Sequence, residues 1–252
     1  MKNPNVYFKP FLSRIFDFNW KTGLFLILVF SVIRFTLALQ ANVTKSYQVI
    51  AFIFIVMILA PFLLLTKAGR RKIGIVYPKS WAGVFLGGFL GAASCAVMFY
   101  VATALFGIGT GNWFVYISKT YSGISALLTD DSRLTYFLIF SASSMFFSPF
   151  GEELFYRGII HECFAQSFGN KTGSIIDSTA FALVHLAHFG IIYSAQGWQF
   201  LPFAAFLWVI LLFGSCLLFY RSRVASGSIL GSIVSHAMFN LTMNYFIFYF
   251  IL

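Results

Sequence analysis

Long apolar runs dominate this chain of 252 residues, which is 60% hydrophobic and has a mean hydropathy of +0.86. A soluble fold of this size could not hide so much apolar surface from water, whereas a run of about 20 apolar residues can cross a bilayer as a helix. The sequence therefore predicts an all-α, polytopic integral membrane helical bundle with about seven transmembrane helices. The apolar runs lie near residues 22–40, 48–66, 82–107, 134–150, 174–194, 199–220 and 228–252.

The basic residues gather in every second connecting segment. A net charge of +10 would suit a nucleic-acid-binding protein, but the placement of the 17 Lys and Arg residues follows a membrane topology instead. Because positively charged loops stay in the cytoplasm, we expect a cytoplasmic N-terminus and no nucleic-acid partner. The composition resembles that of bacterial proteins, so we expect the cytoplasmic (inner) membrane. The residues on the expected cytoplasmic side are Lys2, Lys9, Arg14, Lys21, Lys67, Arg70, Arg71, Lys72, Lys79, Arg157, Lys171, Arg221 and Arg223.

Glutamate and histidine divide the chain into two parts. Residues 1–133 contain neither, and every glutamate and histidine lies in residues 134–252. An ionisable side chain costs about 2.5 to 3.5 kcal/mol at the centre of a membrane helix, so its presence there indicates a function. We therefore expect residues 1–133 to be N-terminal anchoring transmembrane helices and residues 134–252 to form a transmembrane core that holds the functional site.

The first polar motif of the second part is Glu152-Glu153-x-x-x-Arg157, and Pro149 precedes it. Proline favours the first turn of a helix, so a new or kinked helical segment is predicted to begin here. Glu153 and Arg157 have the spacing and order that favour an ion pair on one helix. Glu152 points about 100° away from that pair, which would leave it free for chemistry. The alternative is a Glu–Arg pair at the membrane boundary without a catalytic role.

Two further motifs place histidines inside apolar runs. Phe181-x-x-x-His185 lies in the fifth run, and His236-x-x-x-Asn240 lies in the seventh, with its two polar side chains on one helix face. Each motif alone is also consistent with a polar contact that joins two helices.

The order of the runs predicts that the three motifs meet. The fourth run is expected to end at Glu152 on the cytoplasmic side, and the fifth and seventh runs begin from that side. The carboxylate, two imidazoles and one amide would then share the cytoplasmic half of the bilayer. These groups can activate water against a peptide bond.

The three motifs in this order resemble those of the CPBP intramembrane proteases. That family includes the type II CAAX prenyl endopeptidases and the bacterial Abi bacteriocin-immunity proteins. The resemblance covers about residues 134–245 and implies a CPBP-like catalytic core in residues 134–252. It implies an endopeptidase that cleaves a peptide bond near the cytoplasmic membrane face, in CAAX-type or leader-peptide processing.

The resemblance also implies a role for each motif residue. Glu152 would activate water with the help of His185, and His236 with Asn240 would stabilise the oxyanion of the tetrahedral intermediate. Two further residues would hold the site together, namely Glu153 and Arg157. The expected partners are a peptide or protein substrate at the membrane and the lipid bilayer, with no required cofactor. Neither the substrate nor the oligomeric state follows from the sequence.

Three alternatives stay open at this point. Glu152, His185 and His236 could ligate zinc in a metal-dependent version of the same protease, although the chain has no His-Glu-x-x-His motif. The chain could instead be a non-catalytic immunity or scaffold protein. A proton-coupled transporter would also use buried ionisable groups, but it would need them in the outer half of the membrane, where almost none are expected.

Overall fold

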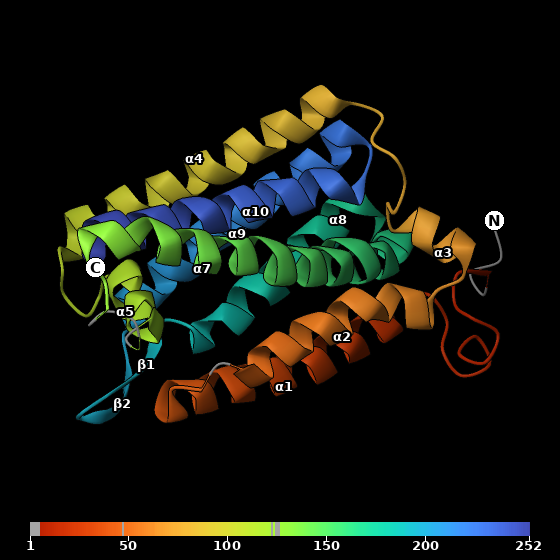
Figure 1. Cartoon of the computed structure of the whole chain (residues 1–252). Helices are drawn as coiled ribbons and strands as arrows, with labels where there is room; N and C mark the ends of the chain where they lie inside the picture. The colour runs from red at the N-terminus through yellow and green to blue at the C-terminus, as the bar shows by residue number, and fades with distance from the viewer. Residues whose placement is uncertain (1–5, 47, 122, 124–126) are drawn as a thin grey trace.

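A computed structural model describes residues 6–46, 48–121, 123 and 127–252 (Figure 1). Helices dominate the described residues, which confirms the predicted all-α class, and one two-stranded hairpin is added to them. The elements are α1 Trp20–Thr44, α2 Gln48–Leu64, α3 Lys67–Lys72, α4 Trp81–Phe106, α5 Trp113–Ser118, the 3-10 helix η2 Lys119–Tyr121, α7 Asp130–Glu152, the π-helix η3 Glu153–Ile160, α8 His161–Val184, the 3-10 helix η4 His185–Ala187, β1 Ile191–Ser194, β2 Gly197–Phe200, α9 Pro202–Ser226, α10 Ile229–Phe246 and the π-helix η5 Ile247–Ile251.

The helices pack in two groups. Helix α10 contacts α4, α7 and α9, while α1 and α2 lie together on the other side of the bundle (Figure 1). Helix α1 packs against α8, and α2 packs against α7. The segment with the glutamate motif therefore lies between the N-terminal helix pair and α10.

Glycines allow α4 to approach both α9 and α10 closely. Gly83, Gly87 and Gly91 recur every fourth residue on α4 and are buried. A Cβ atom added at Gly91 would lie only 1.8 Å from the carbonyl oxygen of Ser235 on α10. Small residues at this spacing are typical of helix pairs that pack tightly within a membrane. Helix α10 is thereby held in a fixed position, and with it the histidine motif that it carries.

Gly169 reverses the direction of the chain within α8. Its backbone has φ 82° and ψ 163°, which is not helical. His161 Nδ1 and Asp177 Oδ2, 16 residues apart in sequence, are 2.9 Å apart in space, whereas a straight helix would separate those residues by about 24 Å. The part of α8 that follows Gly169 therefore runs back along η3. Equal numbers of residues separate Gly169 from Glu153 and from His185, so the reversal brings the two motifs to the same level.

The fifth apolar run does not form one helix, contrary to the prediction for residues 174–194. Helix α8 ends at Val184, and β1 pairs in antiparallel register with β2, with Ile191 opposite Phe200. Gly190 and Gly197 have φ angles of 109° and 87°, a region that only glycine adopts without strain. Gly190 prevents the helix from continuing, and Gly197 allows the turn of the hairpin. Apolar character alone therefore predicted a helix that is longer than the one in the structure.

The predicted count of seven spans is not confirmed. Among the described residues, 4 helices are long and apolar enough to cross a membrane, and they occupy Trp20–Thr44, Trp81–Phe106, Asp130–Ala187 and Pro202–Ser226. The Val49–Leu64 helix is apolar but shorter. Large apolar side chains such as Leu28 on α1 and Phe85 on α4 remain exposed, as expected of surfaces that face lipid.

Candidate active site

The Glu152-Glu153 motif lies inside a continuous helical segment. The fourth run was expected to end at Glu152, with a helix start near Pro149, but α7 continues through Pro149 and changes into the π-helix η3 at Glu153. The motif is therefore not at a helix N-terminus, and both glutamates are fully buried. A new or kinked helical segment was predicted here, and the structure has a π-helix instead. Single π turns inside α-helices occur frequently at functional sites.

Glu152 is paired on both of its oxygens, whereas the sequence predicted that it would be free. Its Oε1 lies 2.5 Å from Nη1 of Arg34, which extends from α1. Its Oε2 accepts a hydrogen bond of 2.5 Å from the hydroxyl of Ser148, one turn earlier on α7. Both charged side chains are almost fully buried, so the Arg34 guanidinium is the nearest compensating charge for this carboxylate.

His185 lies beside the same ion pair. The Nδ1 atom of His185 is 2.7 Å from the carbonyl oxygen of Phe181, so it carries a proton and donates it to that oxygen. In the neutral ring, Nε2 then has a free electron pair, and Arg34 Nη2 donates to it over 3.0 Å. The same Nε2 is 3.7 Å from Glu152 Oε1. Arg34 thus contacts both groups that the sequence assigned to the activation of water.

His236 connects the two glutamates. Its Nδ1 is 2.9 Å from Glu153 Oε1, and its Nε2 is 3.7 Å from Glu152 Oε2. On the other side of Glu153, Arg157 Nε is 3.5 Å from Oε2, so the ion pair predicted from the four-residue spacing is present. Asp177 on α8 lies 3.6 Å from the same Arg157 nitrogen. This buried network joins η3, α8 and α10.

Asn240 and Asn244 bind α10 to α7. The Asn240 amide donates one N–H to the carbonyl oxygen of Ser144 over 2.9 Å, which leaves its second N–H for another acceptor. Asn244 donates to the Ser144 hydroxyl over 2.8 Å and accepts a hydrogen bond from Tyr121. Both asparagines are therefore contacts between helices, and both line the cavity, but Asn240 is the one that lies a single turn from His236.

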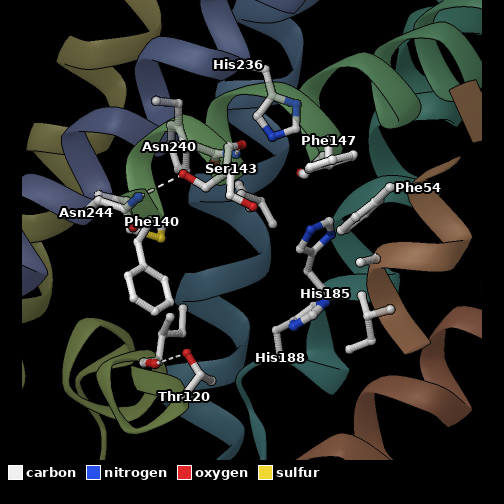
Figure 2. Close-up of a pocket in the computed structure, with 18 of the residues that line it drawn as sticks. Phe54, Thr120, Phe140, Ser143, Phe147, His185, His188, His236, Asn240 and Asn244 are labelled. Atoms are coloured by element: carbon white, nitrogen blue, oxygen red, sulfur yellow. Dashed lines mark hydrogen bonds between the residues drawn. The ribbon is translucent and has the colours of Figure 1, made fainter. Parts of the chain in front are cut away.

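A cavity of about 380 Å³ opens beside these groups. Figure 2 shows His185 and His188 on one side of it and Asn240 and Asn244 on the other. Aromatic side chains supply much of the remaining wall, among them Phe54 and Phe147. Glu152 is not among the lining residues, because Arg34, Ser148 and the histidines separate it from the cavity. The two imidazoles and the Asn240 amide face the space in which a substrate could bind.

The side chains do not form a ready metal site. Glu152, His185 and His236, the alternative zinc ligands, do meet, and the imidazole Nε2 atoms are 3.7 Å from the carboxylate oxygens. Within the described part of the chain, no group of three or more His, Cys, Asp or Glu side chains is arranged to hold a metal ion. A metal ion bound between Glu152 and His185 would meet the guanidinium of Arg34, which already contacts both.

The sequence analysis missed three contributors to the site. Arg34 lies inside the first apolar run and was not assigned to the site. A charge inside a membrane helix needs a partner of opposite charge, and Glu152 could have been considered for it. Ser148 was not singled out, although it lies one helical turn before Glu152. Asp177 was not assigned to the site, and the structure places it beside Arg157.

Comparison with known proteins gives a family for the segment that carries the motifs. Residues 134–242 match the model of the type II CAAX prenyl endopeptidase Rce1-like family. No curated protein and no solved structure matches the chain. The matched residues include both glutamates, Arg157, His185, His236 and Asn240. The helical segment Asp130–Ala187, which carries the first four of them, is long and apolar enough to cross a membrane. Residues 134–242, which hold this cluster, are thus similar to the type II CAAX prenyl endopeptidase Rce1-like family, as the resemblance predicted.

Proposed function

We propose that this protein is an intramembrane endopeptidase that hydrolyses a peptide bond with water activated by Glu152 and His185. The observation that carries the proposal is the buried cluster in which both residues meet Arg34 beside the cavity. Such a cluster of charges is costly in an apolar bundle, and packing alone gives no reason to keep it. Similarity to a peptidase family supports the same conclusion.

The first step needs an oxygen of Glu152 to become accessible from the cavity. Arg34 covers Oε1 and contacts His185 Nε2, so a shift of this guanidinium opens a place for water between the carboxylate and the imidazole. Catalytic contacts of this kind tighten only when substrate is bound. The Glu152 carboxylate then takes a proton from water while the water oxygen bonds to the carbonyl carbon of the substrate, and His185 Nε2 orients the water.

The second step stabilises the charge that forms on the carbonyl oxygen. His236 and Asn240 lie one turn apart on α10 and line the cavity. Asn240 can direct its second N–H at that oxygen, and His236, which donates from Nδ1 to Glu153, offers an Nε2–H when its ring is doubly protonated. Collapse of the intermediate breaks the carbon–nitrogen bond, and the leaving nitrogen receives the proton held by Glu152. The products are a new carboxyl terminus and a free amine, and the carboxylate of Glu152 is restored.

A prenylated C-terminal CAAX peptide is the substrate class that we favour. The family description names this chemistry, and the aromatic wall of the cavity suits an isoprenoid chain. We place the protein in a bacterial cytoplasmic membrane with the N-terminus in the cytoplasm, because of the distribution of basic residues.

The test uses the purified protein in liposomes with two peptides of one sequence, prenylated and unprenylated at the CAAX cysteine. We expect cleavage of the prenylated peptide by the wild type and none by Glu152→Gln. A matched control is Asp131→Asn, an exposed acidic residue at the start of the same helix. Equal cleavage of both peptides would contradict the substrate class, and equal cleavage by wild type and Glu152→Gln would contradict the mechanism.

A further inference from the structure

A second cavity, of about 430 Å³, lies away from the catalytic cluster. Its walls come from α3, from the segment that leads into α4, from the start of α8, and from the connection between α9 and α10. These elements meet at the end of the bundle where α3 lies (Figure 1). None of the glutamate, histidine or asparagine residues assigned to catalysis lines this cavity.

Cationic side chains surround this cavity in excess. Arg71, Lys72, Lys79 and Arg223 line it, and the only carboxylate in its wall is Glu162. Glu162 is already engaged by Lys72 at 2.8 Å and by Arg223 at 2.7 Å. No ion-pair partner of Arg71 or Lys79 occurs within the described residues, so two positive charges face the cavity without compensation by the fold.

One wall of this basic cavity is rigid. Arg223 is largely buried, and it donates both to Glu162 and to the carbonyl oxygen of Arg157. The His161 ring lies in the wall and is fixed by its contact with Asp177. Arg223 thus gives the cavity one fixed cation, beside the exposed side chains of Arg71, Lys72 and Lys79.

The cavity lies at a level where lipid headgroups are expected. Tyr77 and Trp81, exposed on the segment that leads into α4, are joined by a hydrogen bond of 3.2 Å. Tyrosine and tryptophan concentrate where the bilayer meets water, and basic pockets among membrane helices bind anionic headgroups. An excess of Arg and Lys with hydrogen-bond donors is also the usual composition of a phosphate site.

We propose that this basic cavity binds a phosphate-bearing anion, of the kind that an anionic phospholipid headgroup presents. The bound group joins α3, α8 and α9, to which Glu162 also contributes ion pairs with Lys72 and Arg223. The site is independent of the peptidase reaction, and it stabilises the bundle whether or not the catalytic proposal holds.

The test compares two double variants of the purified full chain in detergent. Arg71→Gln/Lys79→Gln removes the uncompensated charges of the cavity. Arg14→Gln/Lys67→Gln is the matched control, because it removes two exposed basic residues that lie outside the cavity. Native mass spectrometry measures the retained lipid, and thermal unfolding measures stabilisation during titration with phosphatidylglycerol, phosphatidylcholine or inorganic phosphate.

We expect phosphatidylglycerol to bind saturably and to raise the unfolding temperature of the wild type and of the control variant. The cavity variant should need at least tenfold more of this lipid for the same effect. Competition by inorganic phosphate would support recognition of the phosphate group, and full stabilisation by phosphate alone would identify a soluble source of it. Equal lipid binding by the two double variants, or equal binding of phosphatidylcholine and phosphatidylglycerol, would overturn the proposal.

Discussion

Arg34 on α1 and Glu152 on α7 form a buried ion pair, with 2.5 Å between Nη1 and Oε1. The pair joins the N-terminal helices to the segment that matches the peptidase family. Arg34 also donates a hydrogen bond to His185. One side chain therefore contacts both groups that we assign to water activation, and it lies between them and the water that they would activate.

Removing Arg34 should destabilise the protein through Glu152. Arg34→Gln leaves a buried carboxylate without its counter-ion, at a cost of about 3 to 5 kcal/mol in the free energy of unfolding. The double variant Arg34→Gln/Glu152→Gln should recover most of that loss, because neither charge is then stranded. Equilibrium unfolding in detergent measures the four free energies of this cycle. Strictly additive effects of the two substitutions would show that the ion pair is not formed.

Substitutions of Asn240 and Asn244 should have different effects, the first mainly on turnover and the second mainly on stability. Asn240→Ala removes a donor at the cavity, so the peptidase kcat should fall by about a hundredfold with little change in KM. Asn244→Ala instead removes hydrogen bonds to Ser144 and Tyr121, so it should lower the unfolding temperature more than the turnover. Steady-state kinetics and thermal unfolding of both variants provide the comparison. The division fails if the two variants lose turnover equally.

Peptidase activity should survive prolonged treatment with a strong chelator. Arg34 already supplies the positive charge beside Glu152 and His185, where a zinc ion would have to bind. We expect the active protein to contain much less than one zinc ion per chain by elemental analysis. Stoichiometric zinc that leaves with the activity and restores it on return would make the protein a metalloprotease.

Cysteine labelling tests the orientation in the membrane. Arg71 and Arg221 lie on the expected cytoplasmic side, and single cysteines there should react only with a reagent applied from that side. A cysteine at Gln196 should react only from outside, since the hairpin lies at the other end of the bundle (Figure 1). Gln196 is preferable to Gly197, whose positive φ disfavours a side chain. Labelling with the opposite sidedness would contradict a cytoplasmic N-terminus.

The local parts of the site were predictable from the sequence, and the parts that join distant elements were not. The Glu153–Arg157 contact follows from a four-residue spacing on one helix, and the spacing of His236 and Asn240 places them on one face. The Arg34–Glu152 pair depends on how α1 packs in the bundle, and no local spacing encodes that.

The path of the chain shows the same limit. The apolar runs correctly predicted that the chain is helical. The reversal at Gly169 and the hairpin after Gly190 were not predicted, because each depends on a single glycine with positive φ. Because the charged motif interrupts the fourth apolar run, the sequence predicted that the run ends at Glu152. The expected meeting of the glutamate and histidine motifs nevertheless occurs, because Gly169 returns His185 to their level.

The most direct test of the central claim compares the peptide termini in membranes that contain the wild type, Glu152→Gln or Asp131→Asn. Mass spectrometry detects these termini whatever the identity of the substrate. We predict new carboxyl termini, from cleavage within or beside apolar segments, in the wild type and in Asp131→Asn but not in Glu152→Gln. The same set of termini in all three membranes, with the three proteins equally abundant and folded, would contradict a peptidase that depends on Glu152.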